Sequence, residues 1–486
     1  MGQEVAKERF SEAEYGRFGE RLKDSLLALR ELLARPGFGA GPATVGAELE
    51  LFLIDEDGRP LRRNKEVREA AGDGRVVLEL GSFNLEVNLT PLPLAGRPFT
   101  AIEAEARDMM GAVDEAARSC GGRVVPIGIL PTLTEFDFTR DSMSDETRYR
   151  ALSRGMRRVR AEPFRVRIDG LERLDLEVED VILESANTSW QVHLRTPPAS
   201  FAGVYNAAQL AIGPVLAASG NSPSFLGRDL WEETRIALFE ASADDRDAER
   251  PWRVDGRVSF GSGWVDGGAG ELFEQSVREY EPVMPVMDEE DPLAVVRAGG
   301  VPGLAELRLH QGTVWQWNRP VYDPAGGGHL RVELRALPAG PTCADMAANA
   351  AFLLGLVLAT AADSGWIGGF PFADAYRNFY RAARSGLDAP LAWPGRDGPV
   401  PAAELVLDLL PVAAEGLASA GVEPDETSRL LDIVGERVRL RRTGAAWQRE
   451  ALAALEDRPG ARGAMLARYR DLAFTGDPVH TWPGLV

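Results

Sequence analysis

Two glutamates, Glu48 and Glu50, lie one residue apart in a segment with the alternating pattern of a β-strand, Thr44 to Asp55. Successive side chains of a strand point to opposite faces, so both carboxylates lie on the same face. Like charges held so close cost free energy unless a cation lies between them, and a divalent ion is the natural counter-charge. The alternative interpretation is an acidic strand end that faces solvent.

A second candidate strand, Val76 to Asn88, carries Glu86 between two asparagines on its polar face. Glu79 lies seven positions earlier, an odd offset that would place it on the opposite face of a regular strand. The two carboxylates converge only if Gly81 marks a turn or a bulge. We therefore expect a turn there, which would bring both carboxylates to the same site.

A third segment, Ser189 to Arg195, places Gln191, His193 and Arg195 on one face. These side chains are candidate ligands for a metal ion or a phosphate group. A lone histidine is more often a hydrogen-bonded structural residue than a ligand, and that alternative stays open for His193.

The fourth segment, His329 to Leu337, places Arg331, Glu333 and Arg335 on one face. Interleaved acids and arginines are as typical of a surface ion-pair ladder as of a functional site. If all four faces line one cavity, its carboxylates suit Mg²⁺, which prefers oxygen ligands, and its arginines suit phosphate. The expected substrate is a polyanion, most simply ATP.

The sequence lacks the residues and motifs that several other kinds of enzyme need. The last lysine is Lys65, so there is no P-loop lysine and little scope for a Schiff base in the body of the protein. No GxSxG, HExxH or CxxC motif occurs, and two cysteines argue against a disulfide framework. The net charge of −20 disfavours nucleic acid and anionic membranes as partners. The N-terminal segment has no apolar signal core, and we expect a cytoplasmic protein that acts on small molecules.

The elements that must position these residues follow from the local patterns. Leucines recur at helical spacing from Leu22 to Leu33 after a capping-box pair, Ser11 and Glu14, so a helix opens the chain. From Thr44 to Pro341 short alternating segments indicate strands, with helical inserts such as Phe201–Ser219. The pattern then becomes helical again, and the apolar run at 347–362 is too short to cross a bilayer comfortably, so we expect a buried helix.

This order indicates the α+β class, an antiparallel sheet with one polar catalytic face backed by helices, rather than alternating βαβ units. We divide the chain into an N-terminal helical segment (1–43), a catalytic sheet domain with helical inserts (44–341) and a C-terminal helical region packed on that domain (342–486).

Five segments, in this order along the chain, resemble the glutamate-cysteine ligase type 2 family and its carboxylate-amine ligase relatives: VGAELEL, ELGSFNLEVN, NTSWQVHL, GNSPSFLGRDLWEETR and RVELRAL. The resemblance covers about Thr44 to Pro341 and implies a glutamine-synthetase-like fold. It departs at Trp315 to Pro320, where an acidic side chain expected before the Arg-Pro pair is missing. We therefore expect the amine-substrate pocket to differ from that of the relatives.

The resemblance also implies roles for individual residues. Arg335 would meet phosphate, and Arg235, after the turn that begins at Asn221, would contact the transferred phosphoryl group; these three residues are the expected nucleotide-binding set, and the two arginines the expected catalytic pair. The expected metal ligands are Glu48, Glu50, Glu79, Glu86, Gln191, His193 and Glu333.

The implied activity is the joining of a carboxylate to an amine through an acyl phosphate, with ATP and Mg²⁺. Glutamate and L-cysteine, the substrates of a step in glutathione biosynthesis, are the leading hypothesis. The alternatives are ligation to another amine, such as ammonia, a polyamine or another amino acid, a guanidino kinase, and a non-catalytic metabolite-binding regulator. A homo-oligomer is compatible with each of them.

Overall fold

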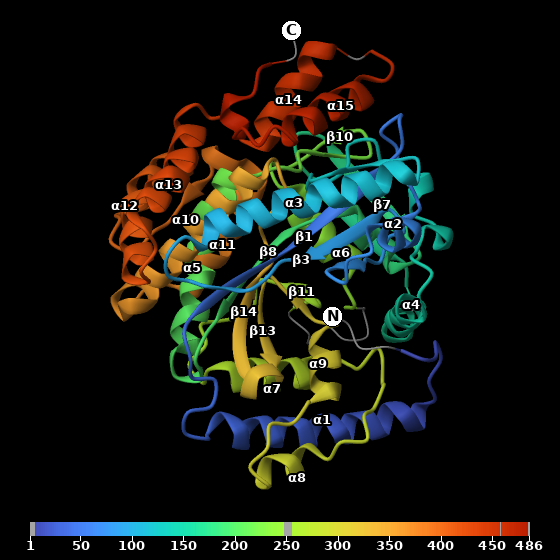
Figure 1. Cartoon of the computed structure of the whole chain (residues 1–486), viewed down its shortest axis with the longest axis vertical. Helices are drawn as coiled ribbons and strands as arrows, with labels where there is room; N and C mark the ends of the chain where they lie inside the picture. Colours follow the sequence, from blue (N-terminus) through green and yellow to red (C-terminus); the bar gives the residue numbers. More distant parts are fainter. Residues whose placement is uncertain (1–4, 161, 247–254, 457, 485–486) are drawn as a thin grey trace.

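A curled antiparallel β-sheet forms the centre of the molecule (Figure 1). The computed structural model describes residues 5–160, 162–246, 255–456 and 458–484. The strands follow the order β13-β14-β8-β1-β3-β2, and β4 and β5 pair with the two ends of β1. Their bounds are β1 Thr44–Ile54, β2 Val76–Leu78, β3 Asn84–Asn88, β4 Leu92–Pro93, β5 Arg123–Val125, β8 Trp190–Arg195, β13 Asn318–Asp323 and β14 His329–Leu334.

The register of these strands brings the four predicted polar faces together. Strand β1 pairs with β3 so that Glu50 lies opposite Glu86, and with β8 so that Glu48 lies opposite Gln191. Strand β14 joins β8 on its other edge. Residues that are directly opposite in antiparallel strands point to the same face, so the polar residues of all four strands share one face of the sheet.

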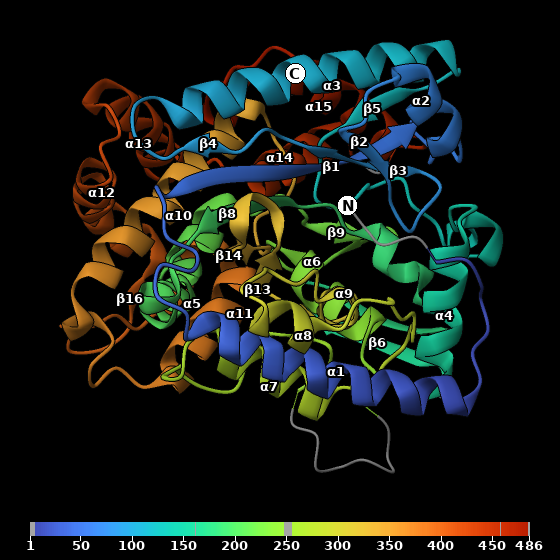
Figure 2. The same ribbon diagram turned by 60° about the horizontal axis from the view of Figure 1, so that its bottom comes forward.

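The other face of β1 is apolar and buried beneath helices. Helix α3 (Pro98–Ser119) packs against β1, α5 (Phe201–Ser219) packs against β13 and β14, and α10 (Cys343–Ala362) contacts α3, α5 and α12 (Ala402–Ser419) (Figures 1 and 2). Each large apolar side chain buried in this way contributes about 1.5–3 kcal/mol. The buried residues of β1 on this face are Val45, Ala47, Leu49, Leu51 and Leu53.

Two helices among the described residues are long and apolar enough to cross a membrane, at Pro198–Ser219 and Cys343–Ala362. In both, 89% of the apolar window is buried inside the protein. Their composition is therefore explained by packing in the core, and the predicted buried helix at 347–362 is confirmed within α10.

The predicted opening helix is also confirmed. Helix α1 (Glu12–Leu33) begins with a capping box in which the Ser11 amide donates to the Glu14 carboxylate over 2.8 Å. It packs against α7 (Ala269–Glu279), α8 (Pro292–Arg297) and α9 (Ala305–Gln311), at the bottom of the view in Figure 1. The insert α5 has the bounds predicted for it.

The remaining elements complete the predicted α+β architecture. One apolar core runs through α3, α5, α10 and α12, and a second joins Phe52 and Phe83 to the C-terminal α15. The division into three parts stays a prediction. The remaining helices are α2 Asn64–Ala71, α4 Thr147–Val159, α6 Thr234–Ser242, α11 Phe372–Ser385, α13 Pro424–Arg439, α14 Gly444–Leu455 and α15 Ala461–Ala473; the two-stranded pairs are β6 Phe164–Asp169 with β7 Arg173–Val178, β9 Ser224–Phe225 with β10 Arg228–Asp229, β11 Val258–Ser259 with β12 Trp315–Gln316, and β15 Pro390–Leu391 with β16 Val400–Pro401.

Candidate functional site

Four glutamates converge on the polar face of the sheet, which we call the acidic face: Glu48, Glu50, Glu79 and Glu86. The turn predicted at Gly81 is present, because β2 and β3 form a hairpin with Val77 opposite Glu86. Glu79 follows Val77 by two residues and so returns to the face of Glu86. The charges of Glu48 and Glu79 both act on Glu86, so the acids from the two hairpin strands and β1 form one cluster.

Burial and mutual repulsion disfavour the charged forms of this cluster. Burial, reinforced by the charge of Glu50, raises the pKa of Glu79 to about 7. Burial and the neighbouring carboxylates hold the pKa of Glu86 well above its ordinary value, and burial raises that of Glu50 despite the nearby Arg335. The acidic face therefore has an excess of negative charge that a bound cation would relieve.

A fifth carboxylate, Glu184, belongs to the same cluster and was missed by sequence reasoning. It lies in a short 3₁₀ helix, Val181–Ala186, between β7 and β8. Burial, with the charges of Glu79 and Glu50, holds the pKa of Glu184 well above its ordinary value. Arg148 of α4 was missed too, although its charge acts against the rise in the pKa of Glu79. Neither residue belongs to an alternating strand, so the period of two gave no signal for them.

Gln191 of β8 and Ser189, the residue just before this strand, hold the two carboxylate oxygens of Glu50. The Gln191 Nε2 donates to Glu50 Oε1 over 2.7 Å, and the Ser189 amide donates to Glu50 Oε2 over 2.6 Å. Gln191 Oε1 in turn accepts a hydrogen bond from Arg335 Nη1 over 2.5 Å. Gln191 thus links the acidic face to the arginines at its edge.

His193 lies beside Glu48, with 3.2 Å between His193 Nε2 and Glu48 Oε1. Burial would raise the pKa of Glu48, but the charge of His193 and its hydrogen bond outweigh it and lower that pKa. Glu48 therefore differs from its neighbours on the face, since it has a basic partner of its own.

Glu333 is enclosed by two arginines. Arg319 from the edge strand β13 grips it in bidentate fashion, with Nη2 2.8 Å and 3.0 Å from the two carboxylate oxygens, and Arg335 also donates to it. Burial would raise the pKa of Glu333, but the charges of Arg319 and Arg335 hold it well below its usual range. Glu333 is therefore ion-paired, but its pairs are largely buried and do not form the surface ladder considered as the alternative for this strand.

A model of the glutamate-cysteine ligase family 2 matches residues 44–468. The chain belongs to this family. It is therefore an ATP-dependent carboxylate–amine ligase, as the five segments implied. The match also extends past Pro341 into the C-terminal helices, beyond the segments that resembled the family in sequence.

The fold of this family 2 chain is similar to those of solved ligase structures. The glutamate–cysteine ligase of Francisella tularensis, in complex with AMP, has a TM-score of 0.57 at 11% identity, over 92% of this chain and 90% of that one. A bifunctional glutathione synthetase from Pasteurella multocida has a TM-score of 0.49 at 10% identity, over 93% of this chain and 55% of that one. No curated protein matches the chain in sequence. The predicted glutamine-synthetase-like fold is confirmed by the first likeness.

Arg235 lies on α6, near the acidic face. Its Nη1 donates to Glu233 Oε1 and to the Ala336 carbonyl, each over 3.1 Å, and its charge opposes the rise in the pKa of Glu50 that burial causes. It therefore lies near the acidic face, as predicted, and its catalytic role stays a prediction.

Asn221 belongs to a buried hydrogen-bond network. Its Nδ2 donates to the Ala339 carbonyl over 2.7 Å and to the Tyr469 hydroxyl over 2.8 Å, and Gln448 donates to its side-chain oxygen. The side chain thus joins the sheet domain to α14 and α15. Its predicted contact with the nucleotide is not tested by this arrangement.

Three of the four carboxylates of the acidic face are held by a neighbouring side chain in this structure. Glu48 and Glu50 are held by residues of β8, and Glu86 accepts a hydrogen bond from Asn88 over 2.8 Å. Across the described ranges, no group of three or more His, Cys, Asp or Glu side chains is arranged to hold one metal ion. The seven predicted metal ligands therefore stay a prediction.

Proposed function

We propose that this chain joins the γ-carboxylate of glutamate to the amine of L-cysteine, with ATP and Mg²⁺, through an acyl phosphate. The observation that carries the proposal is the acidic face of half-buried glutamates bordered by Arg319, Arg335 and Arg235. Family membership supports the ligase reaction itself. What we propose beyond the ligase reaction is that the amine is L-cysteine.

The donor set of the acidic face fits a hard divalent cation. Glu79 and Glu86 have raised pKa values because like charges are buried together, and a cation would favour their charged forms. Glu48, Glu50, Glu79 and Glu86 would hold Mg²⁺, which would offset the charge of the phosphoryl group as it moves.

The arginines at the edge of the face have unused donors for phosphate. Within the part of the chain that the structure describes, the buried Nε atoms of Arg235 and Arg335 have no hydrogen-bond partner. Arginine binds phosphate through several N–H groups at once, so these donors suit the oxygens of a transferred phosphoryl group. Arg335 is also fixed in place by Gln191 and Glu333.

The reaction needs positioning and charge stabilisation but no protein nucleophile. The glutamate γ-carboxylate oxygen attacks the γ-phosphorus of ATP, ADP leaves, and a γ-glutamyl phosphate is formed. The neutral amine then attacks the acyl carbon, inorganic phosphate leaves, and the nitrogen loses a proton. The arginines hold the phosphoryl oxygens during both displacements.

The test is ADP release from Mg-ATP and glutamate in the presence of a panel of amines that includes L-cysteine. We expect L-cysteine to stimulate release most, and Glu50→Gln to reduce the rate by about 100-fold or more because it removes a charge from the acidic face. Glu115→Gln, on the outer side of α3 where the side chain is 79% exposed, is the matched control and should retain full activity.

Three results would count against the proposal. If no amine stimulates ADP release, the ligase reaction fails. If another amine is preferred by a wide margin, cysteine is the wrong substrate. If Glu50→Gln remains fully active, the acidic face is not the catalytic site.

A further inference from the structure

Glu240 is a partly buried carboxylate outside the acidic face, fixed by two aromatic donors. It lies on α6, the helix that also carries Arg235. Its Oε1 accepts hydrogen bonds from Trp317 Nε1 over 2.8 Å and from the Tyr380 hydroxyl over 2.7 Å. The carboxylate is therefore held in one orientation by α11 and by the segment that joins β12 to β13.

Glu240 has no cation of its own. Within the described ranges no arginine, lysine or histidine forms an ion pair with it, and no hydrogen bond reaches its Oε2. The charge of Arg246 acts on Glu240, but its guanidinium binds Asp244 in bidentate fashion over 2.8 Å and 2.9 Å. Burial raises the pKa of Glu240 to about 7. A buried carboxylate without a cationic partner is costly in its charged form, and a cation that binds from outside would lower that cost.

Aromatic rings surround the carboxylate and lead to the surface. Tyr376 and Tyr380 lie on the same side of α11 with their ring centroids 4.7 Å apart, and Tyr376 is 41% exposed. Trp317 packs against Phe239 and Phe379, at 5.7 Å in each case. The faces of aromatic rings attract ammonium groups, in addition to the attraction of the carboxylate, so this set of side chains suits an organic cation.

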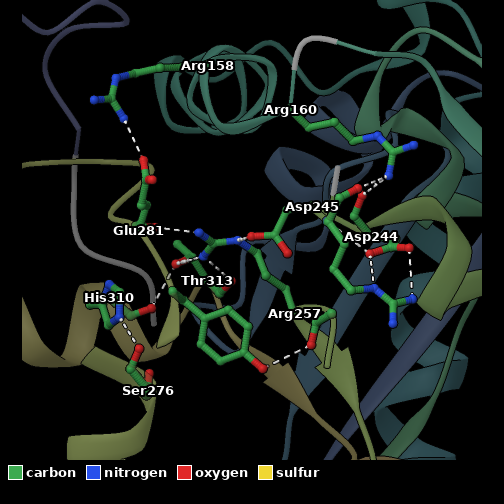
Figure 3. Close-up of polar contacts among 12 residues, drawn as sticks. Arg158, Arg160, Asp244, Asp245, Arg257, Ser276, Glu281, His310 and Thr313 are labelled. Atoms are coloured by element: carbon green, nitrogen blue, oxygen red, sulfur yellow. Dashed lines mark hydrogen bonds and ion pairs between the residues drawn. The ribbon is translucent and has the colours of Figure 1, made fainter. Parts of the chain in front are cut away.

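A buried arginine fixes the backbone on which the cluster is built. Arg257 Nε donates to Asp245 Oδ2 over 2.7 Å, just after α6, and its Nη1 donates to the Thr313 carbonyl over 3.2 Å, just before β12 (Figure 3). Both Arg257 and Asp245 are fully buried. The end of the helix that carries Glu240 is thus tied to the segment that carries Trp317.

The cluster adjoins the phosphate side of the acidic face. The Trp317 carbonyl accepts a hydrogen bond from the Arg335 amide over 2.9 Å. Glu240 and Arg235 are five residues apart on α6, roughly 7.5 Å along the helix axis. Arg335 is thus linked to Glu240 through Trp317, and Arg235 shares a helix with Glu240.

We propose that Glu240, with Tyr376 and Tyr380, binds the ammonium group of the amine acceptor. The proposal rests on the ligase function proposed above and names the residue that recognises its second substrate. The ligand class is an alkylammonium ion, whose charge pairs with Glu240 Oε2 and whose carbon substituents contact the tyrosine rings. Trp317 and the Tyr380 hydroxyl position the carboxylate.

The first test measures binding without catalysis. Tetramethylammonium chloride is titrated into the full chain without nucleotide, with sodium chloride at equal ionic strength as the reference, and tryptophan fluorescence is recorded because Trp317 contacts Glu240. We expect saturable binding that weakens about tenfold or more in Glu240→Gln, because a charged partner is lost. Asp374→Asn is the matched control on α11, since Asp374 already has Arg377 as its partner at 2.5 Å, and it should bind as the wild type does.

The second test separates recognition from a structural role. In Glu240→Gln we expect the KM for the amine to rise about tenfold or more, while the KM values for ATP and glutamate stay within about twofold. Tyr380→Phe keeps the ring and removes one hydrogen bond to Glu240, so we expect a rise of about twofold to fivefold in the amine KM. This variant keeps the inference testable if Glu240→Gln does not fold.

Equal tetramethylammonium binding by the wild type and Glu240→Gln would overturn the inference, as would an unchanged amine KM in both variants. If tetramethylammonium binds as expected but no amine stimulates ADP release, the proposed ligase function has failed, and the assignment of Glu240 to the acceptor falls with it although the ammonium site remains. The two failures are therefore distinguishable.

Discussion

At the scale of single residues, burial decides which groups carry charge. His310 of α9 is 2% exposed, and its Nε2 lies 3.1 Å from the Ser276 carbonyl oxygen (Figure 3). Burial lowers the pKa of His310 to about 4 from an ordinary value of 6.5. The imidazole is therefore neutral in the folded protein at any pH near 7, and Nε2–H donates to the carbonyl.

We predict that His310→Gln makes the protein less sensitive to acid. Between about pH 4 and pH 6.5 the unfolded chain binds a proton at His310 that the folded chain does not, so the free energy of unfolding falls as the pH falls across this window. The lowered pKa corresponds to roughly 3 kcal/mol. Urea unfolding at about pH 7 and about pH 4 should show that the variant loses roughly 3 kcal/mol less than the wild type. An equal loss of unfolding free energy in the two proteins would contradict the lowered pKa of His310.

The acids of the functional site differ from one another for the same kind of reason. Glu48 has His193 and Glu333 has two arginines, so their pKa values are low, whereas Glu79 and Glu184 face other carboxylates and theirs are raised. The environment of each side chain, and not its residue type, thus separates the carboxylates that have basic partners from those that face other carboxylates.

At the scale of elements, a close helix crossing supports the apolar face of the sheet. Helices α10 and α12 meet at Gly355 and Gly416, where a Cβ added to Gly416 would lie 1.9 Å from the Gly355 carbonyl oxygen. A Cβ added to Gly355 would lie 2.5 Å from the Ala413 carbonyl oxygen. Only glycine allows the two backbones to approach this closely.

We predict that Gly416→Ala lowers the free energy of unfolding by about 1–3 kcal/mol, because α12 must move away from α10. Gly111→Ala is the control: Gly111 lies inside α3, no atom lies within 4 Å of its added Cβ, and alanine is the better helix former, so stability should rise by up to about 1 kcal/mol. Urea unfolding measures both variants. If Gly416→Ala is as stable as the wild type, the crossing is not as rigid as the structure indicates.

At the scale of the whole molecule, the excess negative charge of the acidic face couples metal binding to stability and pH. The pKa of Glu79 is raised to about 7 from 4.5, so the folded protein keeps a proton there that the unfolded chain releases. Its contribution therefore lowers the free energy of unfolding as the pH rises from about 4.5 to about 7. A bound cation would oppose this loss at the upper end of the window.

We predict that Mg²⁺ raises the melting temperature more at about pH 8 than at about pH 5, because the carboxyl groups must be ionised to bind it. At a concentration of about 100 times Kd the stabilisation is about 2.7 kcal/mol. Differential scanning calorimetry with and without Mg²⁺, at ionic strength matched with sodium chloride, measures the shift, and Glu50→Gln should reduce it. An equal shift with sodium chloride alone would show that screening, and not binding, is responsible.

The sequence alone determined which residues share a face of each strand. The period of two is a property of the extended backbone, so Glu48 and Glu50, or Gln191 and His193, share a face wherever the strand is placed. The same rule made a turn or bulge at Gly81 the condition for Glu79 to share a face with Glu86, and the hairpin of β2 and β3 meets that condition. The family, and with it the ligase reaction, was also readable from the order of the motifs. The cytoplasmic location and the oligomeric state stay predictions.

Only the tertiary structure decided what lies beside those faces. Glu184 and Arg319 come from a 3₁₀ helix and an edge strand, and each joins the acidic face through contacts with other elements. Glu240 of α6 lies outside that face and meets Trp317 in the same way. Local periodicity cannot encode such pairings, because they depend on how helices and strands pack and not on the spacing of residues within any one of them.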